Sequence, residues 1–325
     1  MVSKHLIDPQ LRPLIDAMPP MDLSLETLGA RRAVMAQMLA QAPPPPVGLA
    51  ASREVLQVQA LDGSGTVRVL AYRPTQVDGE TAALLHIHGG GYVAGSADMM
   101  DVANRELCAA LGCAIFSVDY RLAPEVCFPG ALDDCYAVLK WLYDEAENLK
   151  LDRARIGVKG ESAGGGLAAA LALIARDRGE VVLAFQHLIY PMIDDRTCVK
   201  PDPHPLTGEF IWTNAHNHFG WSALLGAEPG EADVSAYAAA ARATDLAGLP
   251  PTYISVGALD LFLEENLEYA RRLTRAGVPV ELQVYPGVVH GFQMFQSADV
   301  AQRSQHDSRE ALLRALKADF AGQTP

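Results

Sequence analysis

The chain has 325 residues, of which 50% are hydrophobic and 20% are charged, so it can bury a sizeable core. Its formal net charge of −13 at pH 7 argues against nucleic acid or an anionic membrane as a partner. It has no apolar run of about 18 residues and no long apolar stretch near its start, so we expect a cytoplasmic protein without a membrane span. The five cysteines form no C-x-x-C pair, and we expect them to be reduced.

Residues 1–50 differ in pattern from the rest of the chain. Five apolar residues recur at helical spacing and predict an amphipathic helix over residues 23–40: Leu25, Leu28, Met35, Met38 and Leu39. The four prolines at 43–46 would end this helix and act as a stiff spacer. We expect a helical arm that lies on the main body, and not a separate domain.

From residue 54 onward the pattern is that of a sheet protein. Strand-like runs at 54–60 and 66–72 flank Asp62-Gly63-Ser64-Gly65, which is typical of a hairpin. Strands and helices then alternate, which predicts a mostly parallel sheet of eight strands covered by helices on both faces. The further strands are expected at 82–88, 113–120, 155–159, 181–190, 252–256 and 280–285, with helices at 99–111, 131–147, 263–276, 300–320 and directly after residue 162. Between residues 191 and 243 the alternation breaks, and prolines and aromatics indicate an irregular, partly helical insertion.

The stretch Gly160-Glu161-Ser162-Ala163-Gly164 joins a predicted strand to a predicted helix. A serine at the apex of such a sharp turn needs neighbours that are nearly free of side chains, and glycines on both sides provide this. The turn exposes the hydroxyl at the positive end of the following helix. The motif therefore makes Ser162 a candidate nucleophile, although a glycine-rich turn without chemistry would look the same.

A second glycine motif, His88-Gly89-Gly90-Gly91, directly follows the strand predicted at 82–88. Consecutive glycines expose backbone amides, which can stabilise an oxyanion when they lie within hydrogen-bonding distance of the developing charge. A third motif, Tyr120-Arg121-Leu122-Ala123-Pro124-Glu125, has no obvious role in a reaction. We expect this loop to hold the glycine loop in place through hydrogen bonds.

A serine nucleophile needs a base, and the base needs an acid that orients it. We call the sharp strand-to-helix turn around Ser162 the elbow. Where the nucleophile stands on such a turn, the chain order is serine, acid, histidine. His290 is the downstream histidine that stands in a loop just past a predicted strand. Asp260 also follows a strand end and is the favoured acid, with Asp194 and Asp195 as alternatives.

Together these residues resemble the bacterial hormone-sensitive-lipase family of α/β-hydrolases. The resemblance covers most of the chain and rests on five motifs in family order: the two glycine motifs, the 120–125 loop, Gly248-Leu249-Pro250-Pro251 and His290-Gly291-Phe292. It implies an α/β-hydrolase fold in which residues 51–193 and 244–325 form the catalytic domain. Residues 1–50 and the insertion 194–243 would form a cap over the substrate pockets.

The resemblance also implies roles for individual residues. Ser162 would be the nucleophile, His290 the base and Asp260 the acid, and the amides of Gly90, Gly91 and Ala163 would form the oxyanion hole. The chain departs from the family at two places. Glu161 stands where an aspartate is usual, and Leu261-Phe262 follows Asp260 in place of Pro-Leu.

The sequence thus predicts a carboxylesterase that cleaves short-to-medium esters through an acyl-enzyme, with a small-molecule ester as its partner and no metal or organic cofactor. The predicted pocket residues are Tyr92, Phe210 and Trp212, which could equally be cap core, together with Leu261 and Phe262 after the acid. Amide or lactone hydrolysis remains an alternative, as does a ligand-binding protein without catalysis. The resemblance further suggests a homodimer through the strand predicted at 280–285.

Overall fold

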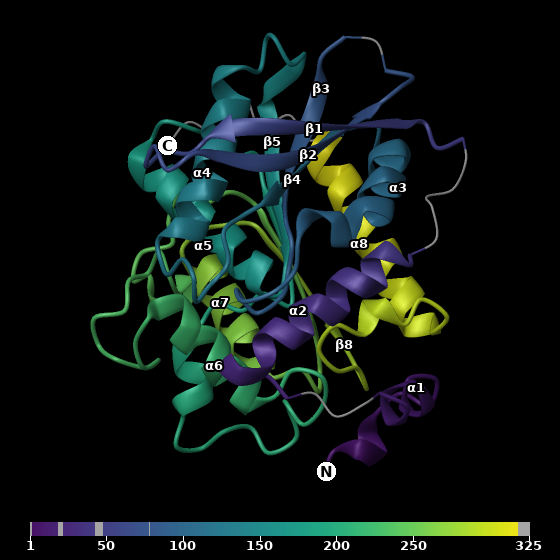
Figure 1. The fold of residues 1–325 in the computed structure, drawn as a ribbon, viewed down its shortest axis with the longest axis vertical. Helices are drawn as coiled ribbons and strands as arrows, with labels where there is room; N and C mark the ends of the chain where they lie inside the picture. The colour runs from purple at the N-terminus through teal and green to yellow at the C-terminus, as the bar shows by residue number, and fades with distance from the viewer. Residues whose placement is uncertain (1, 19–21, 43–47, 78, 318–325) are drawn as a thin grey trace.

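A computed structural model describes residues 2–18, 22–42, 48–77 and 79–317 (Figure 1). It contains one eight-stranded sheet with the order β1-β2-β4-β3-β5-β6-β7-β8. The β1–β2 and β2–β4 pairs are antiparallel and the other five pairs are parallel, which confirms the expected mostly parallel sheet. The strands are β1 (Ala51–Gln59), β2 (Thr66–Pro74), β3 (Thr81–Ile87), β4 (Ala114–Asp119), β5 (Leu151–Glu161), β6 (Gln186–Ile189), β7 (Thr252–Gly257) and β8 (Val280–Tyr285).

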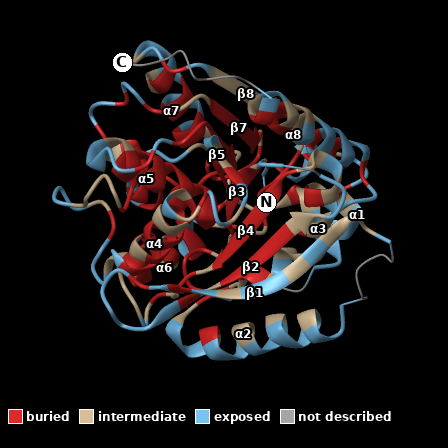
Figure 2. Ribbon diagram, turned by 90° about the horizontal axis from the view of Figure 1, so that it is seen from above, coloured by how far each residue is buried: buried red, intermediate tan, exposed pale blue. Residues whose placement is uncertain are grey.

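Helices cover both faces of this sheet. Figure 2 shows α3 and α8 on one face and α4, α5 and α7 on the other. The α-helices are α1 (Arg12–Asp16), α2 (Leu25–Ala40), α3 (Asp101–Leu111), α4 (Gly130–Asp144), α5 (Ala163–Arg178), α6 (Asn214–Leu225), α7 (Leu263–Arg275) and α8 (Asp299–Lys317). Within the described residues, no helix has the length and apolar character needed to cross a bilayer.

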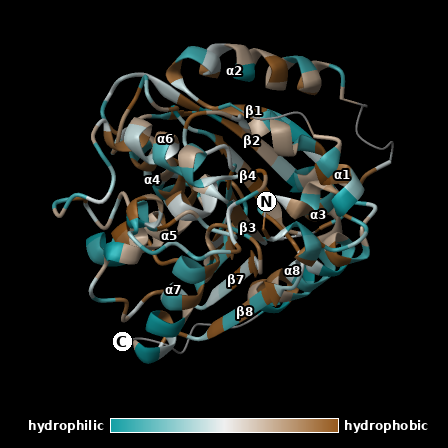
Figure 3. Ribbon diagram, turned by 90° about the horizontal axis from the view of Figure 1, so that it is seen from below, coloured by the Kyte–Doolittle hydropathy of each residue, from teal (hydrophilic) through white to brown (hydrophobic). Residues whose placement is uncertain are grey.

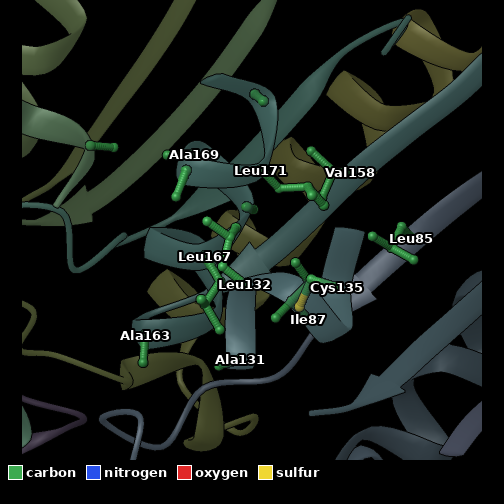
Figure 4. Close-up of a cluster of buried hydrophobic side chains, with 14 of the residues drawn as sticks. Leu85, Ile87, Ala131, Leu132, Cys135, Val158, Ala163, Leu167, Ala169 and Leu171 are labelled. Carbon is green, nitrogen blue, oxygen red and sulfur yellow. The ribbon is translucent and has the colours of Figure 1, made fainter. Parts of the chain in front are cut away.

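The main core lies between the central strands and the helices α4 and α5. In Figure 4, Leu85 and Ile87 of β3 and Val158 of β5 lie close to the buried side chains of α4 and α5. Parallel strands that are covered on both faces carry near-continuous apolar runs, and six of the seven residues of β3 are buried. All five cysteines are free, as expected, and four of them are buried. This core fixes the ends of β3 and β5, where the two glycine motifs begin.

A row of polar residues crosses the face of the sheet that α3 and α8 cover. His86 on β3, Lys159 on β5 and His187 on β6 are register partners in adjacent strands. All three are buried, with at most 8% of each residue exposed. His86 bonds Ser117 through Nδ1 (2.8 Å), and His187 bonds Ser308 of α8 through Nε2 (2.8 Å). The helices on this face therefore cover a polar strip as well as an apolar one.

The prediction of a strand over residues 181–190 is mostly wrong. Only Gln186–Ile189 pair with both neighbouring strands, and residues 181–185 form a loop in which Val182 is 70% exposed. An apolar run of this kind does not distinguish a buried strand from a loop that anchors a few of its side chains. The strand expected at 155–159, in contrast, is longer at both ends.

The helix expected at 23–40 is present as α2, but its predicted apolar stripe is not buried. Ser24 caps it by accepting a hydrogen bond from the Thr27 amide. Leu28 is the one buried residue of α2, whereas Leu25 and Met38 are 71% and 68% exposed. Figure 3 shows α2 as an outer helix beside β1 and β2. The prolines at 43–46 and residues 318–320 of the last expected helix lie outside the described residues.

Candidate active site

Ser162 lies between the end of β5 and the start of α5, with a positive φ angle (φ 56°, ψ −120°). Such a conformation is uncommon for a residue with a side chain. The flanking glycines are required by space, because a Cβ atom on Gly160 would collide with the carbonyl of Gly164, and one on Gly164 with the carbonyl of Ile87. The expected elbow is therefore present, and it packs directly against the end of β3.

Three side chains from distant parts of the chain meet at this turn. The Oγ atom of Ser162 lies 2.8 Å from Nε2 of His290, and Nδ1 of His290 lies 2.8 Å from Oδ2 of Asp260. The other oxygen of Asp260 accepts a hydrogen bond from the amide of Phe262 (2.9 Å). Asp260 is fully buried, so its carboxylate is held in one position.

The two alternative acids lie elsewhere and are engaged by arginines. Asp194 pairs with Arg196 (2.7 Å), and the fully buried Asp195 pairs with Arg242 (2.6 Å). The structure thus brings Asp260, and neither Asp194 nor Asp195, to the imidazole of His290.

Three aromatic rings lie close to the imidazole of His290. The ring centres of Tyr190, Phe262 and Trp212 lie 4.7, 5.0 and 6.2 Å from that of His290. Phe262 and Trp212 were expected near the pocket, but Tyr190 was not. Its signal in the sequence is weak, since it stands at the end of an apolar run that reads as core strand.

The glycine loop abuts the elbow. A Cβ atom on Gly89 would lie 3.3 Å from Cβ of Ser162, so the two chains are in close contact there. Gly90 and Gly91 have positive φ angles of 129° and 63°. In the described part of the chain, the amides of these two glycines donate no backbone hydrogen bond. The amide of Ala163, the first residue of α5, has no partner within its helix. All three amides are therefore without a backbone acceptor, two of them in the loop that contacts the elbow at Gly89 and the third at the residue that follows Ser162.

The 120–125 loop supports the glycine loop, as expected from the sequence. The hydroxyl of Tyr120 donates to the carbonyl of His88 (2.9 Å), and the two rings stack at 4.3 Å. The amide of Ala123 donates to the carbonyl of Tyr92 (3.0 Å). These bonds confirm the prediction that the loop holds the glycine motif by hydrogen bonds.

The five predicted pocket residues are placed in different surroundings. Trp212 lies against Gly91, where an added Cβ atom would collide with the indole. Tyr92 is 1% exposed and donates its hydroxyl to the carbonyl of Met192 (2.8 Å), so the structure gives it a packing position. Phe210 belongs to an apolar cluster with residues of the N-terminal arm, and Leu261 packs on Gly208. Of the five, Trp212 and Phe262 are thus the ones in ring contact with His290.

The segments expected to form the cap touch one another beside the site. The apolar cluster that contains Phe210 also holds Ile7, Leu11 and Ile15 of the arm, and Val288 and Val289 just before His290. The carboxylate of Glu209 accepts hydrogen bonds from the Ser3 amide (2.7 Å) and hydroxyl (2.6 Å). This contact joins the two segments next to the histidine loop.

A buried charged cluster underlies the elbow. The carboxylate of Glu161 pairs with Lys159 and lies 3.0 Å from Nε2 of His86. Burial lowers the pKa of Lys159 to about 7 and that of His86 well below its usual value. Glu161, the residue before the candidate nucleophile, is therefore held by Lys159 and His86 on the face of the sheet that α3 and α8 cover. In the described residues no group of three or more histidine, cysteine, aspartate or glutamate side chains could hold a metal ion.

Comparison with known proteins identifies the family of the chain. The model of a family described as alpha/beta hydrolase fold matches residues 84–294. The chain is a hormone-sensitive-lipase-like α/β-hydrolase. It is 32% identical over 318 residues to carboxylesterase NlhH of Mycobacterium tuberculosis, a match that covers 98% of each chain. It is 35% identical over 256 residues to an ethyl acetate hydrolase of Pseudomonas putida, covering 74% and 76% of the two chains.

Solved structures lead to the same family. A bacterial heroin esterase has a TM-score of 0.91 and 38% identity, with 97% of this chain and 99% of that chain covered. An esterase of Pyrobaculum calidifontis has a TM-score of 0.82 and 30% identity, with coverage of 96% and 100%. These relatives support ester hydrolysis, so this α/β-hydrolase is a serine carboxylic ester hydrolase.

Proposed function

We propose that this ester hydrolase works through an acyl-enzyme formed on Ser162, with His290 as base and Asp260 as the acid that orients it. The observation that carries the proposal is the unbroken hydrogen-bond chain from the serine hydroxyl to the buried carboxylate. His290 takes the serine proton as Oγ attacks the ester carbonyl, and Asp260 stabilises the imidazolium that forms. His290 then protonates the leaving alcohol and activates the water that hydrolyses the acyl-enzyme.

The negative charge of the tetrahedral intermediate would rest on the amides of Gly90, Gly91 and Ala163. The contact of the glycine loop with Ser162 at Gly89 and the lack of backbone partners for these amides support this role. Removing one such donor in a serine hydrolase typically costs about 3–4 kcal/mol of transition-state stabilisation.

We infer that the arm 1–50 and the insertion 194–243 form a joint cap and that the acyl group is short to medium in length. Trp212 supports this limit, because its indole lies directly over Gly91 and next to His290. The relatives include an ethyl acetate hydrolase, which is in keeping with small acyl groups. The homodimer through β8, the last strand of the sheet, stays a prediction.

The decisive experiment compares the native chain with Ser162→Ala and a matched control, Ser222→Ala, on aryl esters of increasing acyl length and on one aryl amide. We expect Ser162→Ala to lose about 10⁴-fold or more in kcat. We expect Ser222→Ala to keep native rates, and a fluorophosphonate to label Ser162 alone. Activity should be highest on the shorter esters and lowest on the amide. An active Ser162→Ala variant would contradict the proposed nucleophile, and faster cleavage of the amide would contradict the ester preference.

A further inference from the structure

A cleft with a volume of about 370 Å³ lies between α3 and α8, on the face of the sheet where Figure 2 shows these helices side by side. Its floor includes Lys159, Glu161 and Tyr190, and its walls carry residues of both helices. The cleft opens to solvent, since Ala103 on α3 and Gln305 on α8 are both lining residues and both exposed. It therefore reaches from the surface to the back of the elbow.

Tyr190 is the side chain shared by this cleft and the candidate catalytic site. Tyr190 is a lining residue of the cleft, and its ring meets the imidazole of His290 edge-on, with ring centres 4.7 Å apart. It is 8% exposed, and its amide is fixed to the carbonyl of Ser255 (2.6 Å). Of the three rings around His290, it is the one that also lines the cleft. Its ring is thus a wall between the cleft and the imidazole.

The chemistry of the proposed triad decides which part of a substrate meets this wall. His290 passes its proton to the leaving alcohol from Nε2, so the alcohol oxygen must approach the imidazole. The carbonyl oxygen must instead point to the amides of the glycine loop. Groups attached to the alcohol oxygen therefore lie beside the His290 ring, where Tyr190 stands, whereas the acyl chain leaves in another direction.

We propose that Tyr190 is a specificity-determining residue: it sets the upper size of the alcohol part of the ester by closing off the α3–α8 cleft. This inference rests on the proposed triad. The cleft walls mix apolar residues, such as Leu107 and Leu312, with amides, such as Gln293 and Gln305, and with the charged residues Glu106 and Arg309. An alcohol that extended into it would be bulky and carry polar groups.

The test uses two ester series: acetates of increasingly bulky alcohols, and ethyl esters of increasingly long acids. We expect Tyr190→Ala to raise the ratio of kcat/KM for bulky over small alcohols roughly tenfold and to leave the acyl-length ratio unchanged. Tyr190→Phe keeps the ring and should behave as the native chain. Tyr190→Leu, which retains more packing, gives the same comparison if Tyr190→Ala does not fold.

A second variant shows whether the added space is the cleft. Ala103→Trp would fill the cleft from α3, where Ala103 is exposed. Combined with Tyr190→Ala it should remove the gain for bulky alcohols, and alone it should leave both ratios native. A uniform fall in both series, or a gain that persists in the double variant, would overturn the inference. An inactive native chain or an active Ser162→Ala variant would instead overturn the triad, so the two failures are distinguishable.

Discussion

At the scale of single residues, Glu161 shows how the elbow is supported from below. It stands where the hormone-sensitive-lipase family usually has aspartate, and its longer side chain reaches both Lys159 and His86. Lys159 is 8% exposed, so its ammonium group depends on this carboxylate for compensation. A buried charge without its partner is strongly destabilising, whereas removal of both charges is far less costly.

We therefore expect Glu161→Gln to lower the free energy of unfolding by about 2 kcal/mol at pH 5.5, where Lys159, with a pKa of about 7, is protonated in the folded protein. Adding Lys159→Met should restore most of this loss, because the uncompensated charge is then gone. Glu147→Gln, at an exposed position, serves as the control and should change little. Urea unfolding of the native chain and the three variants at pH 5.5 measures the effect, and equal stability of the single and double variants would contradict the pairing.

The candidate site could be predicted from the sequence where short motifs carry the geometry. Ser162 and the glycine loop are local, since their conformations depend on neighbours within a few residues. His290 and Asp260 could be placed because each follows a strand end, and all such ends meet at one edge of a parallel sheet. Tyr190 could not be predicted, because its role depends on a cleft between two helices far away in the chain.

At the scale of elements, α2 is held mainly by a polar anchor. The guanidinium group of Arg32 donates to the carbonyls of Val93 (2.7 Å) and Ala123 (2.8 Å) and pairs with Glu125. Val93 in turn donates its amide to the carbonyl of Gly90 (3.2 Å). The arm is thus connected to the glycine loop, a link that helical periodicity alone does not reveal.

We expect Arg32→Ala to raise KM, because the segment after the glycine loop loses the donor that positions it, and to lower stability by about 1–3 kcal/mol. Arg31→Ala, one residue earlier on the same helix, is the matched control and should keep native KM. Steady-state kinetics on one aryl ester, together with thermal unfolding, measure both effects. An unchanged KM in Arg32→Ala would mean that the arm does not influence the loop.

The sequence predicted elements well where periodicity and turn signals agreed, as for the hairpin at 62–65 and the alternation that follows it. It failed for residues 181–185, because an apolar run is equally compatible with a loop packed on the core. It also failed for the stripe of α2, because a helix of this composition is stabilised here by its cap and by Arg32. Both predictions failed because these segments are stabilised by tertiary contacts, which the hydrophobic periodicity of a short segment does not predict.

At the scale of the whole molecule, the buried histidines make stability depend on pH. Burial lowers the pKa of His88 to about 4 and those of His86 and His187 well below their usual value. In the unfolded chain each titrates near 6.5. Their contribution to stability is therefore present above pH 6.5 and is lost as the pH falls, because the unfolded state takes up protons that the folded state excludes.

We expect a loss of about 2 kcal/mol for each of these histidines between pH 7 and pH 5. The buried Glu265, whose pKa is raised by burial, acts in the opposite direction, so the comparison of variants isolates the histidine effect. Urea unfolding at both pH values should give a smaller pH dependence for His187→Gln than for the native chain. His306→Gln, at an exposed position on α8, should keep the native dependence. An equal dependence in all three would contradict the assignment.

The hydrogen bond between Ser162 and His290 joins residues 128 positions apart, and Asp260 arrives from a third strand. No single segment of the chain contains these three side chains in contact, so their alignment exists only when β5, β7 and β8 are docked together. Covalent labelling of Ser162 by a phosphonate would therefore require a folded molecule. The fraction of molecules that become labelled would measure the folded fraction of a preparation. The same measurement, made during refolding, would give the yield of native protein.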